Sequence, residues 1–156
     1  MTLYQTQYAP TPIRKMQSTT QMSKGELLFE IQGKTVSSTI KEITPHGVRI
    51  EMNDEGQTTG KINGGALNTV SVFLKPDGTN EWEGKALNTT KEGDMLVMSS
   101  KGTGHMANPT TGAWQGEVFF MTQSPKLAWL NNTKGWIEGS GDMSQRTYRG
   151  KVYAKK

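Results

Sequence analysis

The sequence predicts an all-β protein, and more specifically a closed antiparallel meander barrel of about eight strands. Apolar and polar residues alternate with a period of two through most of the chain, which is the pattern of half-buried strands. Glycine, proline, asparagine and aspartate separate the alternating segments at hairpin spacing. The C-terminal half repeats one hairpin-sized pattern. A chain of 156 residues fits one such domain.

The elements follow in order from the N-terminus. Residues 1–24 are polar and show no sustained period, so we expect an N-terminal arm before a single barrel domain at 25–156. Turns are predicted at 44–47, 53–56 and 75–78, where proline, glycine, asparagine and aspartate gather. The predicted strand faces around these turns are Leu27, Phe29 and Ile31; Val36, Ser38 and Ile40; Val48, Ile50 and Met52; and Val70, Val72 and Leu74.

The repeat in the C-terminal half indicates how the barrel closes. Segments 81–86, 113–118 and 147–152 share the order aromatic, any residue, glycine, charged residue, small apolar residue, and segments 101–106 and 138–143 share a second, glycine-rich pattern. Because residues i and i+2 of a strand lie on one face, each aromatic residue shares a face with its glycine. The glycine lets the strand bend and leaves space for a neighbouring ring, and a tightly curved, closed sheet needs both.

Segment 124–132 differs from these patterns. After Pro125 it has apolar side chains on both predicted faces, with Leu127 and Trp129 on one and Ala128 and Leu130 on the other. We expect either a strand central to the core or one covered by the N-terminal arm or by a partner. The second arrangement predicts a homo-oligomer, a dimer or trimer.

Composition narrows the function classes. There is no cysteine, which excludes disulfides and thiolate metal sites, and no secretory signal or long apolar run, so a cytoplasmic protein without a membrane span is expected. Only 33% of the residues are hydrophobic, so the aromatic residues, four tryptophans among them, must supply much of the buried area. The net charge of +4 is dispersed rather than gathered in a stripe, which argues against a nucleic-acid partner.

Common catalytic signatures are missing from the sequence. His46 and His105 are its two histidines, and neither has the spacing of a metal site. No nucleophile elbow is present, and the glycines at 102–104 lack the lysine and the following helix of a phosphate loop. No metal and no cofactor is therefore predicted.

Carboxylates within strands are the candidate catalytic groups. Glu138 shares a strand face with Trp136, and Glu117 shares one with Phe119 and Met121. An acid on such a face inside a barrel would be desolvated, which would raise its pKa and suit it to act as a general acid. The alternative is that these faces point outward and that the acids are ordinary surface charges.

A cavity in such a barrel would take its ligand contacts from aromatic and polar side chains. His105 lies near a strand end, where the mouth of the barrel would be, although an exposed strand-end histidine explains it equally simply. The predicted ligand-binding residues are Trp82, Trp114, Trp136, Phe120, His105 and Asn131.

One stretch of the sequence resembles known proteins. The run from Trp114 to Asp142 contains Trp-x-Gly-x-Val-Phe-Phe-x-Thr, Lys-Leu-Ala-Trp-Leu-Asn and Gly-Trp-Ile-Glu-Gly-Ser-Gly-Asp. It resembles small uncharacterised prokaryotic β-barrel proteins and, more distantly, the allene oxide cyclase and dirigent-type barrels, with a shorter, calycin-like similarity to avidin-type strands. The resemblance implies an eight-stranded barrel with an apolar cavity, often trimeric, that folds a reactive small molecule into a chosen conformation. No catalytic residue of those families can be placed on this chain.

These observations lead to one functional hypothesis and two alternatives. The hypothesis is a cofactor-free barrel whose cavity binds a small, largely hydrophobic molecule, as a binding protein or as an isomerase or cyclase. The first alternative is a structural or protein-interaction barrel with a filled interior. The second is a single-stranded nucleic-acid-binding barrel, suggested by the basic composition and the tryptophans.

Overall fold

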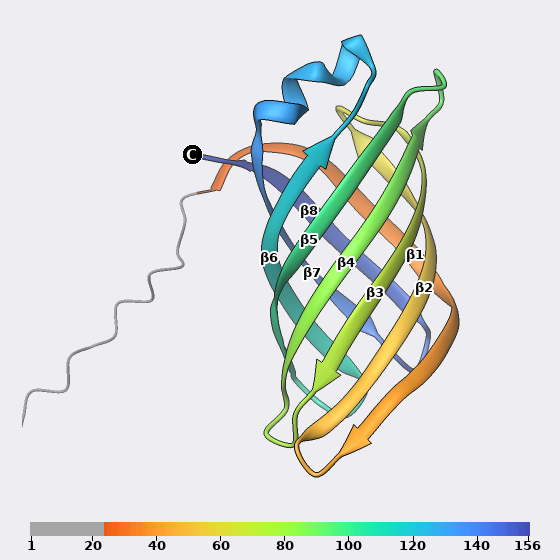
Figure 1. Cartoon of the computed structure of the whole chain (residues 1–156), viewed down its shortest axis with the longest axis vertical. Coiled ribbons are helices and arrows are strands. Elements are labelled where there is room, and N and C mark those ends of the chain that lie inside the picture. The colour runs from red at the N-terminus through yellow and green to blue at the C-terminus, as the bar shows by residue number, and fades with distance from the viewer. Residues whose placement is uncertain (1–23) are drawn as a thin grey trace, which may run out of the picture.

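The computed structural model describes residues 24–156 and shows a closed barrel of eight strands, each antiparallel to the next (Figure 1). The strands follow one another around the barrel in sequence order, and β8 closes it against β1. The elements are β1 Lys24–Thr44, β2 Gly47–Gly60, β3 Gly64–Leu74, β4 Thr79–Thr90, β5 Met95–Met106, β6 Thr111–Met121, the 3-10 helix η1 Pro125–Asn132, β7 Lys134–Asp142 and β8 Thr147–Lys155. The predicted meander barrel is thus confirmed, whereas the predicted arm lies, apart from Lys24, outside the described residues.

Three local predictions were wrong. The two short strands expected around Leu27 and Val36 are one strand, β1, which bends through two irregularities of register instead of turning. Residues 53–56, predicted as a turn, lie within β2 and pair with β1 on one side and β3 on the other. Segment 124–132 forms η1 rather than a strand, with Pro125 in its first turn and Leu127 and Leu130 as its buried residues.

The two ends of the barrel differ. The short turns β1–β2, β3–β4, β5–β6 and β7–β8 gather at one end, which we call the turn end, and η1 lies at the other (Figure 1). The hydrophobic core fills the barrel next to η1, where Leu127 and Leu130 join side chains that point inward from the strands and Ile62 from the β2–β3 connection. These core side chains are Leu28, Phe29, Ile62, Leu96, Val118, Phe120 and Val152. The helix therefore closes this end.

The predicted pairing of rings with glycines is present and explains the inner wall. The indole of Trp114 on β6 lies across Gly139 of β7 and Gly150 of β8, which pair with each other. A Cβ atom added at Gly150 would lie 2.6 Å from Cη2 of Trp114. The ring of Trp82 meets that of Trp114 edge to face, with centroids 5.7 Å apart. Gly139 and Gly150 therefore make room for the ring of Trp114.

Among residues 24–156 we find no helix with the length and apolar character needed to cross a membrane.

Candidate functional site

The interior toward the turn end is not filled. A cavity of about 380 Å³ occupies it, within the size range of small-molecule sites. Its walls are largely apolar and come from side chains on every strand that point inward between the core and the turns. The apolar lining residues are Ile31, Met52, Ala66, Val70, Val72, Leu74, Trp82, Ala86, Met98, Met106, Ala113, Trp114, Ile137 and Met143.

The mouth of the cavity lies beside the β7–β8 turn. Met143 and Arg146 line the cavity and are exposed to solvent, so a ligand has a path from outside. Arg146 has a left-handed backbone conformation with φ of 57°. Its carbonyl oxygen accepts a hydrogen bond from the backbone nitrogen of Thr35 at 2.8 Å. The turn is therefore attached to β1 where β1 bends.

A row of polar side chains crosses the wall of the cavity below this turn. Thr35 of β1, Asp54 of β2 and Asn68 of β3 are direct cross-strand neighbours, and all three line the cavity. Asp54 is only 7% exposed. The Thr35 hydroxyl donates a hydrogen bond of 2.7 Å to Oδ1 of Asp54 and so fixes the orientation of the carboxylate.

Tyr148 of β8 completes this row, which we call the polar cluster: Thr35, Asp54, Asn68 and Tyr148. Its phenol lies over the paired glycines Gly33 and Gly56, and a Cβ atom at Gly33 would be 2.6 Å from the hydroxyl oxygen. This lets the hydroxyl reach β3, where Nδ2 of Asn68 donates a hydrogen bond to it at 2.8 Å. An amide nitrogen only donates, so the hydroxyl proton of Tyr148 remains available to another acceptor.

Burial sets the protonation of the cluster. Burial raises the pKa of the Asp54 carboxyl, and the hydrogen bond from Thr35 opposes the rise. Burial, followed by the negative charge of Asp54, raises the pKa of Tyr148 to about 12, against the effect of the Asn68 hydrogen bond. Tyr148 is therefore a neutral donor at physiological pH, next to a carboxylate whose basicity is increased. Within residues 24–156, no three His, Cys, Asp or Glu side chains are placed to hold a metal ion.

Two of the six predicted ligand-binding residues, Trp82 and Trp114, line the cavity. Phe120 instead packs in the core near η1, edge to face with Phe29 at 6.4 Å. Asn131 holds η1 to the end of β6, because its amide bonds the backbone nitrogen and oxygen of Thr122 at 2.8 and 3.0 Å. His105 is exposed and does not line the cavity, unlike its neighbour Met106.

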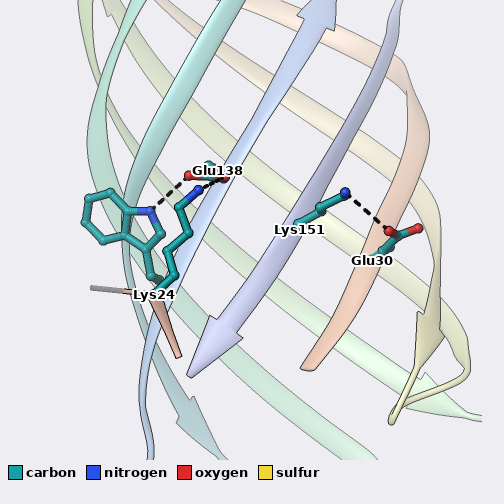
Figure 2. A network of polar contacts seen from close by, with 5 residues as sticks. Lys24, Glu30, Glu138 and Lys151 are labelled. Carbon is teal, nitrogen blue, oxygen red and sulfur yellow. Dashed lines mark hydrogen bonds and ion pairs between the residues drawn. The ribbon is translucent and has the colours of Figure 1, made fainter. Parts of the chain in front are cut away.

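The predicted acids Glu138 and Glu117 lie on the outer face, together with Trp136. Glu138 alternates along β7 with the cavity-lining Ile137, so it points away from the interior. Figure 2 shows its carboxylate next to Lys24, at 2.6 Å, and beside the separate pair of Glu30 and Lys151, at 3.8 Å. The indole nitrogen of Trp136 donates to the other oxygen of Glu138 at 3.3 Å.

The environment expected for these acids was therefore wrong. Glu117 forms a hydrogen-bonded ion pair of 2.7 Å with Lys155, which holds the pKa of the Glu117 carboxyl below its usual value instead of raising it. The Glu117 carboxylate, stabilised in its charged form by Lys155, lacks the raised pKa of a general acid.

Sequence reasoning missed Asp54, Asn68 and Tyr148 as site residues. Tyr148 had a usable signal, because it occupies the aromatic position of the third repeat, equivalent to Trp82 and Trp114, which do line the cavity. Asp54 and Asn68 had none: Asp54 was assigned to a turn, and Asn68 meets Tyr148 from 80 residues away in the chain.

No protein-family model matches the chain, and no curated protein matches it. Its fold resembles solved structures. A protein of unknown function from Clostridium acetobutylicum ATCC 824 is 19% identical with a TM-score of 0.75, over 84% of this chain and 98% of that one. A beta-barrel like protein from Acinetobacter baumannii AYE is 20% identical with a TM-score of 0.71, over 84% of this chain and 94% of that one.

An enzyme from Penicillium herquei is also similar, with 20% identity and a TM-score of 0.64 over 83% of this chain and 92% of that one. At these identities the similarities show the fold alone. They support the predicted resemblance to small uncharacterised β-barrel proteins. The predicted resemblance to allene oxide cyclase and dirigent-type barrels is not confirmed. By fold, the chain groups with small closed β-barrels, and its function must be argued from its own cavity.

Proposed function

We propose that this barrel binds a small, largely apolar molecule in its cavity and acts on it as a cofactor-free isomerase or cyclase. One polar group of the ligand is held at the polar cluster. The observation that carries the proposal is the cavity itself. A barrel with a purely structural role would be expected to fill its interior with side chains along its whole length. Here side chains fill the interior next to η1, but a cavity of about 380 Å³ remains between them and the turn end.

The chemistry of the walls supports a ligand that is apolar over most of its surface. Aromatic rings and methionines surround the cavity, and the four side chains of the polar cluster lie together on one side of it, on β8, β1, β2 and β3. This combination orients a ligand, because the walls accept any compact apolar body while the polar cluster accepts only a group that can hydrogen-bond. One of the structural neighbours is an enzyme, which is compatible with catalysis on this fold.

The proposal can be tested with 2-tetralone, a bicyclic ketone that serves as a compact apolar probe with one polar atom. Trp82 and Trp114 line the cavity, so binding is read as quenching of tryptophan fluorescence. The test variant is Ala86→Phe, which places a ring in the cavity, and its control is Leu87→Phe, the next residue of β4, which is 38% exposed on the outer face.

We expect saturable quenching in the unmodified protein, at least about tenfold weaker binding in Ala86→Phe, and an affinity within about twofold of the unmodified protein in Leu87→Phe. Circular dichroism would establish that both variants fold. Absence of saturable quenching, or equal affinity in the two variants, would overturn the proposal.

A further inference from the structure

We propose that Asp54 and Tyr148 form a proton-transfer pair, and that the ligand of the cavity is a carbonyl compound with an acidic C–H bond next to its carbonyl group. Asp54 removes that proton, and Tyr148 donates a hydrogen bond to the carbonyl oxygen. This inference rests on the proposed function, because it requires a ligand in the cavity. It adds the substrate class and the residues that act on it.

Asp54 is buried without an ion-pair partner among the described residues. Within residues 24–156 every ion pair is made by a glutamate, so Asp54 has no cationic partner there. Its only side-chain hydrogen bond in that part of the chain comes from Thr35 to Oδ1. A buried carboxylate without a cation costs folding free energy and is typical of a functional group. Its second oxygen is free to meet a ligand in the cavity.

The hydroxyl of Tyr148 is held in a fixed position. Asn68 donates to the oxygen of this hydroxyl and thereby leaves its proton for a further acceptor. The phenol lies against Gly33 and Gly56, where any side chain would displace it. A hydroxyl held in this way is a preorganised donor for negative charge that develops on a ligand oxygen.

Asp54 and Tyr148 face the same cavity from β2 and β8, the two strands that flank β1. Asn68, which holds Tyr148, is the direct cross-strand neighbour of Asp54, and all three line the one cavity. The charge of Asp54 acts on Tyr148 strongly enough to contribute to its raised pKa. A base and an oxyanion donor on one side of an apolar cavity form the arrangement that proton abstraction next to a carbonyl needs.

The reaction step balances without a cofactor. The Asp54 carboxylate takes the proton from the carbon next to the carbonyl, and the electron pair of that C–H bond forms a carbon–carbon double bond. The π pair of the carbonyl moves onto oxygen, where the Tyr148 O–H hydrogen bond stabilises the enolate. When the ligand also has a carbon–carbon double bond in conjugation with the enolate, return of the proton from Asp54 to the far end of that conjugated system gives an isomer with the double bond shifted. Return of the proton to the same carbon regenerates the ligand. The step involves no oxidation or reduction.

The experiment measures exchange of the α-hydrogens of 2-tetralone for deuterium in D₂O by proton NMR. The test variants are Asp54→Asn and Tyr148→Phe, which keep the shapes of the side chains. The matched controls are Glu83→Gln, an exposed acid on β4, and Tyr153→Phe, a tyrosine of β8 on the outer face beside Lys24. Binding of 2-tetralone is followed in every variant by fluorescence quenching.

We expect the unmodified protein to exchange 2-tetralone well above the buffer rate. Loss of the base should lower the enzymatic rate by about 10²-fold or more, and loss of the oxyanion donor by about 10²-fold. The two controls should stay within about twofold of the unmodified protein, and Asp54→Asn should still bind 2-tetralone. Retention of binding is the readout that separates loss of the reacting group from loss of the site.

Two results would overturn the inference. One is saturable binding of 2-tetralone by the unmodified protein with no exchange above buffer, which would leave the proposed binding function standing. The other is a wild-type exchange rate in either Asp54→Asn or Tyr148→Phe. Absence of binding to the unmodified protein would instead overturn the proposed function, and this inference with it.

Discussion

Substitution of Gly139 by alanine tests the structural basis of the cavity wall. A Cβ atom there would overlap two groups from different strands, the carbonyl oxygen of Arg149 on β8 and the ring of Trp114 on β6. The carbonyl belongs to the neighbouring strand and cannot move without disturbing β8, and Trp114 is already packed against Trp82. Overpacking of this kind costs about 1–3 kcal/mol. Because one obstacle is backbone, we expect a loss of about 3 kcal/mol in the free energy of unfolding.

The matched control is Gly65→Ala on β3, where an added Cβ atom has no other atom within 4 Å. Glycine within a strand is entropically unfavourable, so this variant should be neutral or stabilised by up to about 1 kcal/mol. Urea-induced unfolding followed by circular dichroism measures both variants. The reasoning would be refuted if Gly139→Ala unfolded at the same urea concentration as the unmodified protein, or if Gly65→Ala lost as much stability as Gly139→Ala.

Two further predictions concern Asp54 and Asn131. The pKa of Asp54 is raised in the folded state, so the folded protein loses stability as the pH rises through that raised value and the carboxyl ionises. Asparagine cannot ionise, so we expect Asp54→Asn to be more stable than the unmodified protein at pH 7, by about 1 kcal/mol. The stability advantage of Asp54→Asn should vanish below the ordinary carboxyl pKa of 3.8. Thermal unfolding at neutral and acidic pH measures this. A difference in stability between the variant and the unmodified protein that is the same at both pH values would contradict the prediction. Asn131→Ala should lower the free energy of unfolding by about 1–2 kcal/mol, because it removes both hydrogen bonds to Thr122. Its affinity for 2-tetralone should not change, and a weaker affinity would show that Asn131 contributes to ligand binding.

The architecture could be predicted from the sequence because its signals are local. Alternation with a period of two marks the strands, and the aromatic–glycine repeat marks the curvature that closes them. The same repeat placed Trp82 and Trp114 on faces that do line the interior. Proline at the start of 125–132 was the available sign that this segment would leave the sheet. The continuous apolar run at 127–130, which fits a strand buried on both faces, concealed that sign.

The candidate site could be predicted only in part, for two physical reasons. A period of two separates the faces of a strand without saying which face is inside, and this is why Glu138 and Trp136 were assigned to the interior. Asp54 lies among residues with strong turn preferences, but its strand is fixed by pairing with β1 and β3 and by the ring of Tyr148, which needs Gly56 beneath it. Tertiary contacts of this kind override local preference and leave no local pattern in the sequence.

The location of a bound ligand tests the central claim most directly, and the methionines provide the probes. Met52, Met98 and Met106 line the cavity, whereas Met95 and Met121 are exposed on the outer face. With methyl-labelled methionine, nuclear Overhauser effects report which methyl groups lie next to bound 2-tetralone. We expect contacts from the ligand to Met52, Met98 and Met106 and none to Met95 or Met121. Contacts confined to the two outer methionines would contradict this expectation.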